Sequence, residues 1–148
     1  MGTVDPKGSF VRWQGVAIAQ LTYAANLVLT FAVATLGFQA TLLLNDKFTL
    51  AGAWQKCVFT LSLILIATSI AFGIAVVVNR LRDFRATKEA ARLREEEAGD
   101  SSIEPYRQLY RRLGVNTWRL FWWQLGTFGI GTALTAAAFI PFAAQKLF

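Results

Sequence analysis

The sequence predicts an all-α, polytopic membrane protein with three transmembrane helices, the second of which extends into a cytoplasmic αα hairpin. The chain has 148 residues, of which 55% are hydrophobic and 16% charged, and a mean hydropathy of +0.42. A soluble domain is about a quarter charged. The apolar residues gather in three blocks without Asp, Glu, Lys or Arg, each long enough to cross a bilayer core of about 30 Å. We therefore expect residues 1–148 to form a single membrane domain.

The alternative fold is a soluble bundle that buries the same three helices. Helices of soluble bundles usually carry a polar face and are about 8 to 20 residues long. Three uncharged blocks in one short chain make this alternative a poor fit to the sequence.

The first predicted transmembrane helix covers residues 14–44. Its apolar stretch is longer than the roughly 7 to 15 residues of a signal-peptide core, so we expect it to stay in the mature chain. Small and polar residues recur along it at steps of three or four, which places them on one face: Ala19, Thr22, Asn26, Thr30, Ala34 and Gly37. Helices in lipid associate through small residues and interhelical hydrogen bonds. We predict that this face packs against another helix and that Asn26 finds a partner there.

The second predicted transmembrane helix covers residues 57–79. Ser69 and Gly73 lie on one of its faces, and a second small or polar face ends at Asn79. Two such faces predict two neighbours, one within the chain and one in a second protein. Residues 79–97 contain no Gly or Pro and are rich in Ala, Arg, Leu and Glu, which favour helices. The helix is therefore predicted to continue past the membrane.

A cytoplasmic helical hairpin is predicted for residues 80–114. Ser101 and Glu104 have the spacing of a capping box, and Gly114 is suited to end the second hairpin helix. That helix could instead lie along the membrane surface. Basic residues beside an apolar stripe are typical of segments that contact anionic headgroups. We predict headgroup or partner contacts for Arg80, Arg82, Arg85, Arg107, Arg111 and Arg112.

The third predicted transmembrane helix covers residues 117–145, with Asn116 as its N-terminal cap. Pro141 is predicted to bend or end its last turn. Four small residues permit close approach of another backbone, and we predict that they pack against a helix: Gly126, Gly129, Ala133 and Ala137.

The positive charges predict the topology. Ten Lys and Arg residues lie between the second and third apolar blocks, and such residues favour the cytoplasmic side. The N-terminus is then cytoplasmic and the C-terminus outside, and the charge rule together with the lack of an organelle signal favours a bacterial inner membrane. Nucleic acid is not an expected partner, because seven acidic residues are interleaved with the ten basic ones.

The residue types disfavour several classes of function. The chain has no His and one Cys, Cys57, which excludes Ser-His-Asp and Cys-His sites and an internal disulfide. We expect no enzyme activity, no cofactor and no metal. Ion-coupled transporters mark their path with ionisable residues inside the membrane, and the three apolar blocks contain none.

Two functions remain after these exclusions. The first is an accessory or structural subunit of a larger membrane complex, with lipids, other membrane subunits or copies of itself as partners. The alternative is a homo-oligomeric channel or membrane-pore effector. Its pore would be lined by the face of Asn26 and Thr30, or by the faces of Ser69 and Asn79.

Overall fold

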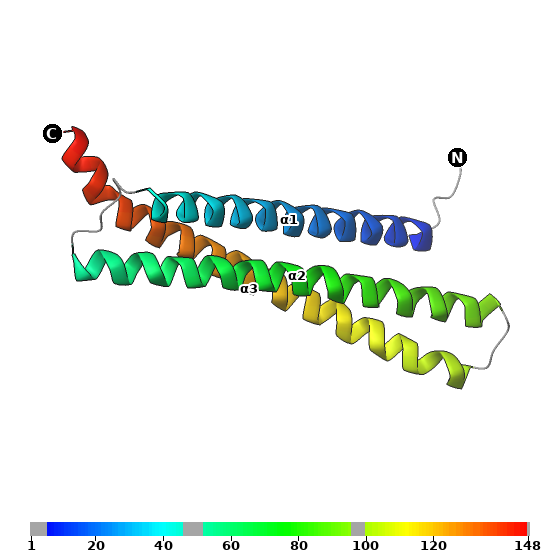
Figure 1. Cartoon of the computed structure of the whole chain (residues 1–148). Helices are drawn as coiled ribbons and strands as arrows, with labels where there is room; N and C mark the ends of the chain where they lie inside the picture. The colour runs from blue at the N-terminus through cyan, green and yellow to red at the C-terminus, as the bar shows by residue number, and fades with distance from the viewer. Residues whose placement is uncertain (1–5, 46–51, 96–99, 148) are drawn as a thin grey trace, which may run out of the picture.

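Three long helices make up the computed structural model, which describes residues 6–45, 52–95 and 100–147 (Figure 1). They are α1 (Pro6–Leu43), α2 (Ala53–Glu95) and α3 (Asp100–Leu147). Each is long and apolar enough to cross a membrane. The prediction of an all-α protein with three candidate transmembrane helices is confirmed.

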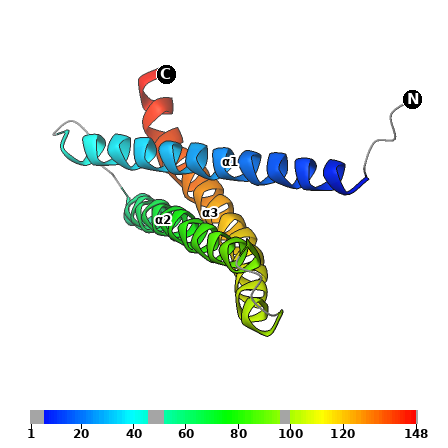
Figure 2. The ribbon, with the colours of Figure 1, turned by 90° about the vertical axis from the view of Figure 1, so that its right-hand side faces the viewer.

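The three helices alternate in direction. α1 and α3 run the same way, and α2 runs antiparallel to both (Figure 1). Most contacts are between α2 and α3, and α1 contacts α2 more than α3. Figure 2 shows that α3 is inclined to the other two helices, so that its C-terminal half passes close to α1. The contacts therefore lie along seams between pairs of helices, without a wide central core.

Two small apolar clusters lie in these seams. One contains Leu21, Ala25, Val76 and Phe121, and the other contains Val58, Phe59 and Ala138. Many large apolar side chains instead face outwards; Leu44 is 85% exposed and Ile140 is 66% exposed. A soluble bundle would bury such residues because exposure to water costs roughly 25 cal/mol per Å². An apolar outer surface of this kind is stable in contact with lipid. Together with the three helices that are long and apolar enough to cross a membrane, it identifies the chain as an integral membrane protein.

The helices extend beyond the predicted membrane spans. α1 begins at Pro6, while the candidate span within it is Gly15–Leu43, close to the predicted 14–44, and α2 begins at Ala53, before the predicted start at residue 57. Pro is favoured at the first position of a helix because its missing N–H needs no partner there. The predicted turn at residues 98–102 falls partly outside the described residues.

The predicted break between the hairpin and the third transmembrane helix is wrong. α3 continues through Gly114 and Asn116 as one helix, and Pro141 does not end it. An interior Gly costs only about 1 kcal/mol relative to Ala, and here Asn79 of α2 makes hydrogen bonds to residues on both sides of it, Leu113 and Thr117. The side chain of Asn79 donates to the carbonyl oxygen of Leu113, one residue before the predicted stop.

Candidate functional site

Polar contacts between the helices occur at three levels along the bundle. We name them the boundary level, around Arg80; the central level, around Gln124; and the far level, around Gln39. At each level, buried polar side chains make hydrogen bonds from one helix to another.

At the far level, Gln39 of α1 joins all three helices. Its Nε2 atom donates to Oγ of Ser62 on α2 at 3.0 Å and to Oγ1 of Thr135 on α3 at 2.6 Å. Each hydroxyl also donates to a carbonyl oxygen of its own helix, that of Phe59 or that of Gly131. Both Gln39 and Ser62 are fully buried. The hydroxyls therefore accept from Gln39 without losing their local hydrogen bonds.

At the central level, Gln124 of α3 makes the corresponding contact. Its Nε2 atom donates to the backbone carbonyl of Ala25 on α1 at 3.1 Å, and the backbone carbonyl of Gln124 accepts from the hydroxyl of Ser69 on α2 at 2.9 Å. Gly73 makes room for this side chain. A Cβ added there would lie 2.7 Å from Nε2 of Gln124 and 2.9 Å from Cδ1 of Leu29.

At the boundary level, Arg80 connects α2 to α1. Its Nη2 atom donates to the carbonyl oxygen of Ile18 at 3.2 Å, and its Nη1 atom lies 3.4 Å from Oδ2 of Asp83. Arg80 is only 8% exposed. It therefore differs from the other arginines predicted to contact headgroups, because its guanidinium group contacts Asp83 and the backbone of α1.

The boundary level also connects α2 to α3 through Asn79. Its Nδ2 atom donates to the carbonyl of Leu113 at 2.8 Å and to Oγ1 of Thr117 at 2.7 Å. Thr117 is buried, and it donates in turn to the same carbonyl. Asn79 belonged to a face predicted to contact a neighbour, and the structure places that neighbour on α3.

The separation of these levels matches a bilayer. At 1.5 Å per residue, the boundary and far levels are about 27 Å apart along α2 and about 32 Å apart along α1. A bilayer hydrocarbon core is about 30 Å thick. Polar groups inside lipid must find partners within the protein. The two outer levels are therefore separated by about the thickness of a bilayer hydrocarbon core.

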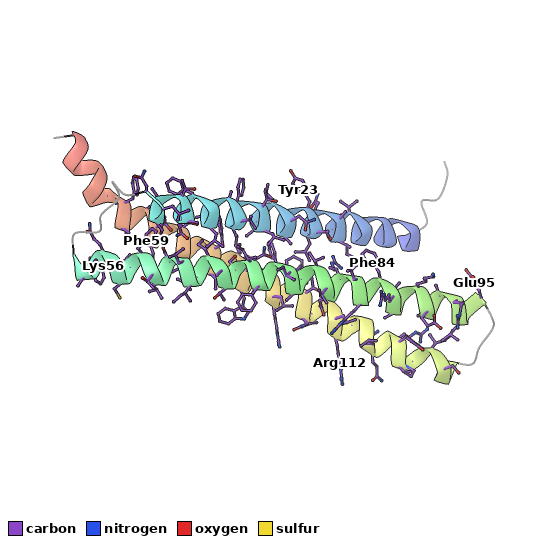
Figure 3. All side chains as sticks on the ribbon, viewed as in Figure 1. Tyr23, Lys56, Phe59, Phe84, Glu95 and Arg112 are labelled. Carbon is purple, nitrogen blue, oxygen red and sulfur yellow. The ribbon has the colours of Figure 1, made fainter. Side chains whose placement is uncertain are left out.

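The predicted packing stripe of α1 faces away from α2 and α3. Thr22 is half-buried and the other five members are exposed, including Asn26. The hydroxyls of Thr22 and Thr30 donate to carbonyls of their own helix. Within the chain, α1 packs instead through Leu21, Ala25, Ala32 and Gln39. Figure 3 shows Tyr23, next to the stripe, pointing away from the other helices.

The predicted stripe of α3 is exposed as well. Gly126, Gly129, Ala133 and Ala137 are all exposed. A Cβ added at Gly126 or Gly129 would meet nothing within 4 Å. The glycine of α3 that does contact another helix is Gly131, where an added Cβ would lie 2.9 Å from Cδ1 of Ile66. Of the predicted packing residues, Ser69 and Gly73 are the two that are buried against other helices.

Sequence reasoning missed Gln39 and Gln124, both fully buried. The available signal was a Gln inside an uncharged block, because an amide in lipid needs a partner. The signal is weak, since Gln20 also lies inside an uncharged block and is exposed.

The remaining predicted arginines lie on the surface of the charged ends of α2 and α3. Arg82, Arg85, Arg111 and Arg112 are exposed, while Arg107 is half-buried and lies 3.7 Å from a carboxylate oxygen of Glu104. Open grooves adjoin them, and one is lined by Arg111, Arg112, Leu113, Val115, Asn116 and Arg119. Arg112 points away from α1 and α2 (Figure 3).

Neither a metal-binding cluster among the described residues nor a similarity to known proteins identifies the function of these residues. Across residues 6–45, 52–95 and 100–147, no three His, Cys, Asp or Glu side chains gather where they could hold a metal ion. Comparisons with protein-family models, curated proteins and solved structures give no match to this chain. The geometry described above is therefore the basis for a function.

Proposed function

We propose that this chain is a non-enzymatic membrane protein that acts by helix–helix assembly, as an accessory or structural subunit of a larger membrane complex. One observation carries the proposal. The small-residue stripes of α1 and α3 are exposed, while the chain holds itself together through other residues such as Gln39, Gln124 and Asn79.

The exposed stripes suit a helix of another subunit. Gly129, Ala133 and Ala137 follow one another at steps of four, which lets a second backbone approach closely. On α1, the amide of Asn26 is exposed within an uncharged segment. In lipid, that amide is stabilised by a partner from another chain, by up to about 1 to 2 kcal/mol.

The proposal includes an orientation in a bacterial inner membrane. The charged ends of α2 and α3, residues 80–114, would lie in the cytoplasm together with the N-terminus, and the C-terminus would lie outside. The excess of arginines at these ends supports this orientation, because positive residues are retained on the cytoplasmic side.

A pore formed by copies of this chain is the second candidate. Ser69 and Asn79 are buried inside the chain, so they do not line such a pore. The exposed Asn26 and Thr30 of α1 are left as its lining. This candidate predicts a ring of defined size that conducts ions in planar bilayers.

Gentle detergent extraction of the tagged full-length chain, followed by native mass spectrometry, tests the proposal. We expect larger membrane proteins to co-purify. Ala133→Leu should reduce their recovery at least severalfold, because a bulky side chain blocks close approach. Ala67→Leu makes the same change on an exposed position of α2 and is the matched control. A lone homo-oligomer, or equal losses in both variants, would reject the accessory role.

A further inference from the structure

One exposed face of α3 changes character along its length. Arg111, Val115, Trp118 and Trp122 recur at steps of four, three and four, so they share a helix face. Trp118 is 49% exposed and Trp122 is 62% exposed. Two open grooves of about 560 Å³ each lie along this face and share Val115 and Arg119.

The first groove is cationic and the second is apolar. Arg111, Arg112, Asn116 and Arg119 supply the polar lining of the first. The second is lined by Val115, Trp118, Arg119, Trp122, Trp123 and Gly126. Because no atom lies within 4 Å of a Cβ built on Gly126, the apolar groove stays open towards the middle of the helix. A ligand that fills both grooves must have a polar end and an apolar end.

The arginines of the first groove have no ion-pair partner within residues 6–45, 52–95 and 100–147. Arg80, Arg92 and Arg107 each lie within ion-pair distance of a carboxylate. Among the described side chains, no carboxylate forms such a pair with Arg111, Arg112 or Arg119. The groove beside Arg82 and Arg85, in contrast, has the acidic residue Glu89 in its lining. The cationic groove of α3 therefore complements an anion.

The position of the two grooves identifies the occupant. Arg119 is the last charged residue before the uncharged block 120–145, and Thr117 lies at the boundary level. The cationic groove is thus at headgroup depth, and the apolar groove faces the hydrocarbon. A soluble anion or a nucleic acid would leave the tryptophan groove empty.

We infer that this face of α3 is a binding site for an anionic phospholipid. The phosphate lies against Arg111, Arg112 and Arg119, where planar guanidinium groups donate paired hydrogen bonds to its oxygens. An acyl chain follows the groove between Trp118, Trp122 and Gly126. The inference does not depend on the proposed role as a subunit, because a single copy of the chain supplies every group that touches the lipid.

Native mass spectrometry of the purified full chain tests this site. The protein is mixed with equal amounts of phosphatidylglycerol and phosphatidylcholine that carry the same acyl chains. We expect phosphatidylglycerol to be retained preferentially. The double variant Arg112→Gln/Arg119→Gln should lower its retention by about fivefold for each charge removed. Arg82→Gln/Arg85→Gln removes the same charge from α2, beside a groove that also contains Glu89 in its lining, and should lower retention much less.

A third variant separates the site from general charge attraction. Trp122→Ala keeps the net charge, and we expect it to reduce retention of phosphatidylglycerol severalfold. Inorganic phosphate should not displace the lipid, because it leaves the apolar groove unfilled. Equal retention of the two lipids, equal losses in both arginine variants, unchanged retention in Trp122→Ala or displacement by phosphate would each overturn the inference. Circular dichroism confirms that every variant keeps its helices.

Discussion

Gln39 of α1 donates a hydrogen bond to Thr135 of α3 across 2.6 Å, joining residues that are 96 positions apart in the chain. The same Nε2 atom also donates to Ser62 of α2. One amide group therefore links all three helices near one end of the span. The hydrophobic effect does not drive helices together in lipid, because lipid tails are equally apolar. Close packing and polar contacts of this kind therefore stabilise the pairing of the helices.

Replacing Gln39 should weaken the attachment of α1. Gln39→Leu removes two hydrogen bonds, although it also removes an amide oxygen that has no partner among the described residues. We expect the free energy of unfolding in micelles, measured by titration with sodium dodecyl sulfate, to fall by about 0.5 to 1 kcal/mol. Gln20→Leu makes the same change at an exposed position and should not lower stability. A Gln39→Leu protein as stable as the unmodified chain would contradict this role.

The pair formed by Arg80 and Asp83 should show energetic coupling. Loss of either partner leaves the other mostly buried without its counter-charge. We expect Arg80→Leu and Asp83→Leu each to cost about 1 to 3 kcal/mol, and the double variant to cost less than their sum. The same micelle titration measures all three. Glu89→Gln disrupts a more exposed ion pair and should cost less than about 1 kcal/mol. Additive losses at Arg80 and Asp83 would show that the two residues act independently.

The change in stability when a glycine is replaced by alanine should depend on the atoms that the added Cβ meets. Gly73→Ala places a Cβ 2.7 Å from Gln124, so we expect a loss of about 1 to 3 kcal/mol. Gly126→Ala meets no atom within 4 Å, and better helix propensity should keep or raise stability by up to about 1 kcal/mol. Thermal unfolding in detergent ranks the two variants. The opposite ranking would mean that the seam between α2 and α3 is placed incorrectly.

The orientation can be measured with single cysteines. In a Cys57→Ser background, Lys56→Cys and Thr87→Cys place thiols at exposed positions near opposite ends of α2. We expect a membrane-impermeant maleimide to label Lys56→Cys in intact spheroplasts, and Thr87→Cys only after the membrane is permeabilised. Labelling in the reverse order would invert the proposed topology.

Some features of this protein follow from its sequence because they depend on short stretches of chain. The three uncharged blocks predict three membrane helices, since length and hydropathy are local properties. The continuation of α2 beyond Arg80 follows from a run of helix-forming residues without Gly or Pro. The continuity of α3 at Gly114 does not follow in this way, because contacts from α2 offset a weak local stop signal.

The face that each helix turns towards its neighbours was decided only by the tertiary structure. Small residues suit a helix contact and a lipid-facing surface almost equally well, so the stripe from Ala19 to Gly37 could not be assigned from spacing alone. The structure turns Gln39 inwards and Asn26 outwards on the same helix, because Gln39 is the one that meets hydroxyl groups from both other helices. Hydropathy along the chain determined that the helices enter the membrane. The positions of hydrogen-bond partners on distant helices determined how they fit together.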